Sequence, residues 1–466
     1  MQIFNDLTRK KEEFTTIEPG KVKMYACGPT VYNFFHIGNA RCFVVFDMFR
    51  RYLEYRGYDV TFVQNFTDVD DKMIKKANEE GVTVADIADR YIAEYFTDAK
   101  GLGIHPADIH PRATENIGQI IGLVSKLVKS GHAYATGSGD VYFRTRSFAK
   151  YGCLSHMPIE DLESGARIAV GEIKEDPLDF ALWKAAKPGE PAWQSPWGMG
   201  RPGWHIECSA MVGRYLGKTI DLHCGGVDLT FPHHENEIAQ SEAANGCVFS
   251  NYWMHNGFIN VDNQKMSKSL NNFFTVRDVA AVYGYPAIRF FLLSSHYRKP
   301  INYSTEVIEA AKNSIERIQN CADSLAFYLK DAPDGSEDLP AEVIGSLEAH
   351  RQNFIDRMDD DFNTADAVSE LFEIVRELNS YLATSPTKQA AKKAGDIFLE
   401  LGNLLGFIGE TAADRELADK VEALIAERAE AKAAKNFARA DEIRAELSTM
   451  GITLQDTKNG TRWKKN

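Results

Sequence analysis

An alternation of strand, helix and strand at the start of the chain restricts the fold more than any other feature. Residues 22–26 form a short apolar strand candidate, residues 39–56 carry apolar side chains at helical spacing, and residues 58–63 predict the next strand. Parallel neighbours need a crossover connection, so this unit predicts a parallel sheet within an α/β fold. Ligands of such sheets bind at the carboxyl ends of the strands, and we therefore expect a site just beyond residue 26.

The rest of the chain divides into segments of different character. Pro-, Trp- and Gly-rich sequence predicts an insertion, and amphipathic periodicity later predicts a helical bundle with helices near 341–358, 364–382 and 388–407. One charged helix is predicted over 416–447, ahead of a short tail. The expected domains are a Rossmann-like parallel-sheet domain (1–115 and 201–255), an insertion (116–200), a loop-bearing region (256–303), the bundle (304–410) and a small C-terminal domain (411–466).

Composition excludes several classes of protein. The 466 residues are 44% hydrophobic, which is ordinary for globular chains, and the seven irregularly spaced cysteines do not form a disulfide framework. No apolar run approaches the roughly 18 residues of a membrane span, and the N-terminus lacks a signal peptide. We expect a protein of the reducing cytoplasm, without a membrane partner.

The net charge of −13 argues at first against a polyanionic partner. It is unevenly distributed, however: residues 432–466 contain eight basic and four acidic groups, a net charge of +4 that leaves −17 for the preceding 431 residues. A basic segment on an acidic body is typical of a local RNA contact, although a solvated amphipathic helix carries similar charge.

Two short stretches have the residues for binding phosphate. The first, residues 27–39, follows a strand and opens a helix, and it contains His36, Gly38 and Asn39. The second contains Lys265, Ser267 and Lys268 in a small polar loop. Either stretch alone is more often structural or solvated surface.

A possible metal site is scattered along the chain. Cys27, Cys208, His233 and Glu237 offer two thiolates, an imidazole and a carboxylate, a donor set that suits tetrahedral Zn²⁺. His234 or Glu235 could equally supply the pair from this stretch. Residues 213–219 lack the spacing of a P-loop, residues 234–238 lack the second histidine of a zinc-protease helix, and no G-x-S-x-G motif is present.

Together and in this order, residues 36–39 and 265–269 resemble the two signatures of class I aminoacyl-tRNA synthetases. The first signature departs at Asn39, where the family usually has His, and the second matches fully. The resemblance implies Mg²⁺-ATP as co-substrate, with catalysis by His36, Asn39, Lys265 and Lys268 and further ATP contacts from Gly38 and Ser267. Amino-acid carboxylate would attack the α-phosphate, so positioning and charge neutralisation dominate.

Four longer stretches, residues 27–32, 65–72, 203–211 and 231–237, resemble cysteinyl-tRNA synthetases of the bacterial type, and the similarity extends to residues 460–463. It implies cysteine activation, tRNA(Cys) as partner and a monomer. It also implies one Zn²⁺ on Cys27, Cys208, His233 and Glu237 that ligates the substrate thiolate and discriminates against serine. Thr67, Trp204 and His223 would lie near substrate cysteine. Phe437, Asp441 and Arg444 would contact tRNA from a C-terminal anticodon-binding domain.

Two other functions remain open. A ligase that joins cysteine to an amino-sugar inositol shares both signatures and the zinc site, but it has no anticodon to read. A non-catalytic RNA-binding or zinc-storage protein would not need His36 together with Lys268. Among the remaining cysteines, 42, 153, 247 and 321 are interpreted as packing residues, whereas Cys224 stands where the family commonly has Gly and could be a second thiol near the metal.

Overall fold

The computed structural model describes residues 1–158, 174–265, 274–335, 337–408, 412–457 and 460–465. The chain forms two compact units, Met1–Phe407 and Ile408–Asn466, which are described separately. The candidate residues Ser267 and Lys268 lie outside the described residues.

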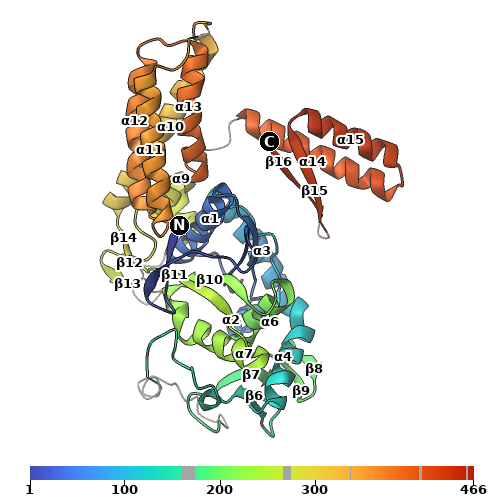
Figure 1. The fold of residues 1–466 in the computed structure, drawn as a ribbon. Coiled ribbons are helices and arrows are strands. Elements are labelled where there is room, and N and C mark those ends of the chain that lie inside the picture. The colour runs from blue at the N-terminus through green and yellow to red at the C-terminus, as the bar shows by residue number, and fades with distance from the viewer. Residues whose placement is uncertain (159–173, 266–273, 336, 409–411, 458–459, 466) are drawn as a thin grey trace. The chain divides into compact units, whose positions relative to one another are not determined.

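A four-stranded parallel sheet organises the first unit (Figure 1). Its strand order is β11-β10-β3-β4, with all neighbours parallel. The strands are β3 (Lys21–Ala26), β4 (Asp59–Gln64), β10 (Ile220–Gly226) and β11 (Ser250–Asn256). Strand β3 lies between β4, the next strand of this sheet along the chain, and β10, which comes much later in the sequence. The strand order therefore reverses between β3 and β10, and their carboxyl ends mark the topological switch point. The predicted α/β fold with a parallel sheet is confirmed.

Helix α1 (Ile37–Tyr55) is the crossover between β3 and β4. His36 caps its N-terminus, because the His36 Nδ1 accepts the backbone N–H of Asn39 at 3.2 Å. Phe43, Phe46 and Phe49 are all buried, which fits a helix that contacts both the sheet and the helices α9 and α13. The remaining helices around this sheet are α2 (Asp71–Glu80), α3 (Val84–Gly101), α4 (Ile117–Lys129), α6 (Ile206–Tyr215) and α7 (Glu235–Asn245).

The insertion contains a five-stranded antiparallel sheet of order β5-β6-β7-β9-β8. Its core is shared with α4 and α6, where Trp183 and Phe143 are fully buried. The strands are β5 (Ala133–Ala135), β6 (Val141–Phe143), β7 (Phe180–Ala185), β8 (Trp193–Ser195) and β9 (Gly198–Pro202). A separate hairpin, β1 (Gln2–Asn5) with β2 (Lys10–Glu13), lies against β11.

A small three-stranded sheet follows β11, with order β13-β12-β14. It is made of β12 (Ile259–Val261), β13 (Gln264–Lys265) and β14 (Ile301–Tyr303). Helices α8 (Val276–Tyr283) and α9 (Tyr285–Leu293) separate β13 from β14 along the chain.

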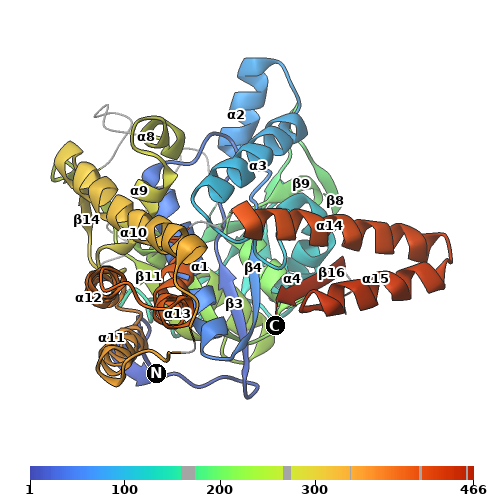
Figure 2. The same ribbon diagram turned by 90° about the horizontal axis from the view of Figure 1, so that it is seen from above.

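The predicted helical bundle is present, and Figure 2 views α11, α12 and α13 nearly end-on. Its helices are α10 (Thr305–Asp331), α11 (Ala341–Asp359), α12 (Thr364–Leu382) and α13 (Lys388–Leu404). In the described part of the chain, no helix combines the length and apolarity that crossing a membrane requires.

The second unit corrects one prediction. Residues 416–447 are not a single helix but a hairpin of α14 (Ala412–Ala433) and α15 (Phe437–Thr449). Lys435 has a positive φ of 57°, and the Asn436 side chain caps α15 by accepting the backbone N–H of Arg439. Apolar side chains of both helices pack with Ile452 of β15 (Ile452–Thr457), which pairs with β16 (Gly460–Lys465). The turn over residues 433–436 contains neither Gly nor Pro, and for that reason the break is not evident from the sequence.

Candidate active site and metal centre

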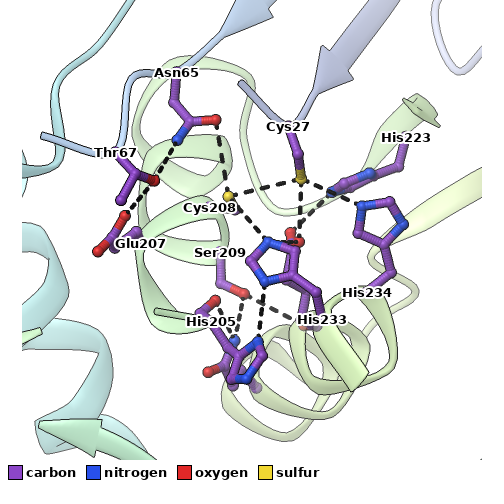
Figure 3. Close-up of polar contacts among 12 residues, drawn as sticks. Cys27, Asn65, Thr67, His205, Glu207, Cys208, Ser209, His223, His233 and His234 are labelled. Carbon is purple, nitrogen blue, oxygen red and sulfur yellow. Dashed lines mark hydrogen bonds and ion pairs between the residues drawn. The ribbon is translucent and has the colours of Figure 1, made fainter. Parts of the chain in front are cut away.

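Four buried donor side chains meet beside the switch point of the parallel sheet (Figure 3). Cys27 directly follows β3, and Cys208 lies in the first turn of α6. His233 and Glu237 come from the start of α7, where an irregular turn over Thr230–His234 precedes the regular helix. Residues separated by more than 200 positions in sequence therefore present their donor atoms to one point.

Four separations among these donors are close to the edges of a tetrahedral zinc site. Zn–S bonds near 2.3 Å and Zn–N or Zn–O bonds near 2.0–2.1 Å give tetrahedral edges of about 3.8 Å between two sulfurs, about 3.5 Å for mixed pairs and about 3.3 Å between nitrogen and oxygen. The Cys27 and Cys208 sulfurs are 3.8 Å apart. Cys208 Sγ lies 3.6 Å from His233 Nε2, and Cys27 Sγ lies 3.5 Å from Glu237 Oε1. His233 Nε2 and Glu237 Oε1 are 3.1 Å apart.

A second grouping shares two of these residues. Cys27 and Glu237 also come together with His223 and His234, and the four donor atoms again lie within 4.8 Å of one another. This set has one thiolate where the first has two. In addition, His223 Nε2 is already hydrogen-bonded to Glu237 Oε2 at 2.8 Å. The first set therefore fits Zn²⁺ better.

Glu235, the other alternative left by the sequence, points away from this cluster. Its buried carboxylate accepts backbone N–H groups of Gly152, Leu154 and Ser155 at 2.8–3.1 Å. Glu235 thus anchors the insertion to α7 rather than offering a free donor to a metal.

The charges within the cluster favour a bound cation. Burial alone would raise the pKa of Glu237, but His223 and His233 outweigh it and hold that pKa at about 2. Burial opposes protonation of His233, yet Glu237 and Cys208 raise its pKa to about 10. The hydrogen bond from Cys27 lowers the pKa of Cys208 to about 7, whereas burial raises that of Cys27. Without a metal, His233 thus keeps a proton between Glu237 and Cys208. A divalent ion bound at this point would replace that proton and neutralise the negative charge of these two side chains.

Several supporting residues were not recognised in the sequence. His205 Nδ1 lies 3.0 Å from His233 Nδ1, so it fixes the imidazole whose other nitrogen faces the cluster. The side-chain oxygen Oδ1 of Asn65 accepts the backbone N–H of Gly28 and lies 3.9 Å from the sulfur of Cys208. The side-chain nitrogen of Asn65 lies 3.5 Å from the hydroxyl of Thr67. The spacing of the metal ligands along the chain cannot identify such groups, since the supporting residues come from other segments.

A histidine chain continues behind Cys27. His234 Nε2 lies 3.3 Å from Cys27 Sγ, and its Nδ1 lies 2.8 Å from His255 Nε2. His255 Nδ1 is in turn 2.7 Å from a carboxylate oxygen of Asp6, in the N-terminal hairpin loop. Nothing in the sequence indicates that Asp6 approaches the site.

The three residues predicted near substrate cysteine border the same cluster. The Thr67 hydroxyl is hydrogen-bonded to Glu207 at 2.9 Å, and the side-chain nitrogen of Asn65 lies 3.5 Å from the same oxygen. The Trp204 ring lies 4.4 Å from that of His233 and is 43% exposed. His223 is fully buried against Trp253, and its Nδ1 has no partner among the described residues.

Of the predicted ATP residues, the structure describes His36, Gly38 and Asn39 at the N-terminus of α1 and Lys265 in β13. Because the Nδ1 of His36 accepts the N–H of Asn39, the Nε2 of His36 carries the ring hydrogen and is a donor. Gly38 and Asn39 are half-buried in the first turn of α1. The backbone of Lys265 pairs with Asn260 of β12.

The open question of Cys224 is answered by the sheet. Neighbouring residues of a strand point to opposite faces, so Cys224 lies on the face of β10 away from His223. Burial, and next the thiol of Cys42 on α1, raise the pKa of Cys224. Cys224 belongs to neither metal grouping found among the described residues. Cys42 and Cys321 are buried, as interpreted from the sequence.

The three predicted RNA residues are exposed on one helix of the second unit. Phe437, the first residue of α15, is 63% exposed, and Asp441 and Arg444 are exposed as well. Other basic residues nearby are occupied by ion pairs: Arg439 with Glu427 and Glu442, and Lys432 with Asp456.

Solved structures with this fold define the class of protein. The methionyl-tRNA synthetase of Mycobacterium tuberculosis in complex with methionyl-adenylate matches with a TM-score of 0.65 at 16% identity, covering 86% of this chain and 94% of the other. The LeuRS of Agrobacterium radiobacter K84, in a ternary complex with tRNA and LeuAMS, matches with a TM-score of 0.59 at 12% identity, covering 84% and 86%. The first unit has the fold of a class I aminoacyl-tRNA synthetase.

Sequence comparison gives the particular family. The model of the class I (C) tRNA synthetase catalytic domain matches residues 13–313, a DALR domain matches 353–409, and the cysteinyl-tRNA ligase anticodon binding domain matches 414–463. The cysteine–tRNA ligase of Clostridioides difficile (strain 630) is 55% identical over 466 residues, the full length of both chains. The chain belongs to the cysteine–tRNA ligase family.

Proposed function

We propose that this protein activates L-cysteine with ATP and transfers it to the 3′ end of tRNA(Cys). The observation that carries the proposal is the set of four donors, Cys27, Cys208, His233 and Glu237, at tetrahedral separations beside the switch point. The first signature begins on the same loop as Cys27, so a metal-bound amino acid would lie next to the nucleotide site.

Selection of cysteine over serine follows from the donor set. When bound, Zn²⁺ supplies a further coordination position for the substrate thiolate, whose pKa it lowers. Shape alone separates near-isosteres by only about 10–200-fold, and a hydroxyl is much harder to deprotonate than a thiol. We propose that Thr67, Trp204 and His223 border this substrate, with Thr67 oriented by Glu207.

Adenylate formation requires mainly positioning. The cysteine carboxylate attacks the α-phosphorus of ATP, the bond to the β-phosphate breaks, and pyrophosphate leaves. His36 would donate Nε2–H to a phosphate oxygen, and the positive end of the α1 helix dipole, beside Gly38, also favours phosphate. Lys265, Ser267 and Lys268 are proposed to bind the leaving pyrophosphate, with Mg²⁺ accompanying ATP.

The second unit is proposed to bind the anticodon stem-loop. The exposed ring of Phe437 suits stacking on an unpaired base, with Asp441 and Arg444 near base edges. The match of residues 414–463 to an anticodon binding domain favours this function over the amino-sugar ligase. We further propose a monomer that acts in the cytoplasm.

Two assays test the proposal on purified protein: ATP–pyrophosphate exchange with cysteine or serine, and charging of tRNA(Cys). We expect zinc-dependent exchange with cysteine, little exchange with serine, and charging of tRNA. Exchange without any charging would favour the amino-sugar ligase, and absence of exchange would favour a non-catalytic protein.

The variant Cys208→Ser distinguishes the binding of cysteine from the binding of ATP. It removes one metal ligand and leaves the phosphate contacts, so the KM for cysteine should rise at least about 100-fold while the KM for ATP changes little. Cys247→Ser is the matched control, because Cys247 is half-buried, accepts a hydrogen bond from Thr219 and belongs to neither metal grouping found among the described residues. Equal losses for both substrates would contradict thiolate ligation by Cys208.

A further inference from the structure

Arg41 of α1 is completely buried and is surrounded by backbone carbonyl groups. Its guanidinium nitrogens Nη1 and Nη2 donate to five carbonyl oxygens at 2.5–3.3 Å. The acceptors are the carbonyls of Gly257, Phe258, His296, Tyr297 and Lys299.

No carboxylate compensates this charge among the residues that the structure describes. Burial without an acidic neighbour lowers the pKa of Arg41 to about 10. A buried cation held only by carbonyl dipoles is costly to keep, yet five converging acceptors would be equally costly to leave without donors. Only a guanidinium offers a planar array of N–H groups wide enough to bridge two separate chain segments, since a lysine has three donors on one atom.

The two segments that Arg41 joins are the entries to the small three-stranded sheet. Gly257 and Phe258 lead directly into β12, which pairs with β13 and so with the backbone of Lys265. Residues 296–299 lead into β14, which pairs with the other edge of β12. Arg41 itself lies one turn after Ile37, at the start of the helix that His36 caps.

The crossing of these segments is also closely packed by its backbone. A Cβ atom on Gly257 would lie 2.7 Å from the carbonyl oxygen of Lys299 and 2.8 Å from that of Arg298. The N–H of Gly257 donates to Tyr297, and the N–H of Ile301 donates to Phe258. The entries to β12 and β14 therefore form one rigid crossing, and Arg41 attaches it to α1.

We propose that Arg41 is a positioning residue for adenylate formation: it fixes the β12–β13–β14 sheet on α1 and so sets the position of Lys265, at the end of β13, relative to His36 at the start of α1. This inference rests on the proposed function. Catalysis by placement is sensitive to displacement, since an error of about 1 Å can cost about 100-fold in rate. Among the described residues, no hydrogen bond of Arg41 goes to the metal cluster or to its supporting histidines, so cysteine binding should be independent of Arg41.

The test compares Arg41→Lys with Arg289→Lys. Arg289 is equally buried and also donates to backbone carbonyls, but its partners include Asp47, Leu102 and Leu405, none of which belongs to either signature. Arg41→Lys should lower the kcat of cysteine-dependent exchange about 10–100-fold and raise the KM for ATP, with zinc content and the KM for cysteine unchanged. Arg289→Lys should lower the midpoint of urea unfolding while its kcat stays within about threefold of wild type.

A second variant keeps the test decisive if Arg41→Lys does not fold. Gly257→Ala leaves the guanidinium in place but pushes the two segments apart, so the same loss of kcat with unchanged zinc content is expected. Unchanged kcat in a folded variant, or an equal kcat loss in Arg289→Lys, would overturn the positioning role. Absence of cysteine-dependent exchange in the wild type would instead refute the proposed function.

Discussion

Two buried glutamates, two residues apart in one motif, have different structural roles although their residue type and burial are the same. Glu235 and Glu237 are both fully buried at the start of α7. Glu237 faces the metal cluster, whereas Glu235 accepts three backbone N–H groups from residues 152–155. The sequence offers both as ligands, and only the direction of each side chain separates them.

Substitution by glutamine should separate these two functions. Glu237→Gln removes the anionic ligand, so zinc content per chain should fall well below that of the wild type while folding is retained in excess zinc. Glu235→Gln should retain zinc but lower the free energy of unfolding by about 2–3 kcal/mol, because one carboxylate oxygen becomes a donor facing N–H groups. Metal analysis and urea unfolding measure the two effects, and zinc loss in Glu235→Gln would contradict this assignment.

Helix α1 combines three functions along its length. Its first turn carries the candidate phosphate residues, Arg41 holds the three-stranded sheet, and Asp47 pairs with Arg51 and Arg289 near its middle. Burial alone would raise the pKa of Asp47, but Arg51 and Arg289 outweigh it and lower that pKa to about 2. Apolar periodicity predicts this helix, but the buried polar residues fix it to its neighbours.

The Asp47 ion pairs should appear in the acid dependence of stability. A carboxyl whose pKa is lower in the folded protein contributes stability above its ordinary pKa of 3.8, and this contribution is lost as the pH falls toward about 2. Between pH 5 and 2, the wild type should lose about 2 kcal/mol more than Asp47→Asn. Urea unfolding in the presence of a chelator removes any contribution from metal release, and parallel pH profiles for the two chains would refute the ion-pair contribution.

At the scale of the whole molecule, we propose that amino-acid activation and anticodon binding belong to different compact units. The donor cluster and the first signature lie within Met1–Phe407, and the residues proposed to contact the anticodon lie within Ile408–Asn466. The second unit has a hydrophobic core of its own, built from α14, α15 and β15. Amino-acid activation should therefore not depend on the second unit.

A chain that ends at residue 411 tests this division. Cysteine-dependent exchange should stay within about twofold of the full chain, because all of its proposed groups are retained. Charging of tRNA should fall at least about 100-fold in kcat/KM, since lost base stacking and charge contacts are worth about 3 kcal/mol. In the full chain, Phe437→Ala provides the milder comparison, and full charging by the truncated chain would contradict anticodon binding by this unit.

The sequence by itself determined the α/β class, the bundle and the family, because strand and helix periodicity, signature spacing and long motifs are local patterns. It also proposed the donor set, although it could not exclude His234 or Glu235. Only the tertiary structure decided which donors converge, that Cys224 lies on the other face of β10, and that residues 416–447 form a hairpin. It alone revealed His205, Asp6 and Arg41, since their contacts join segments that are distant in sequence and leave no periodic pattern to detect.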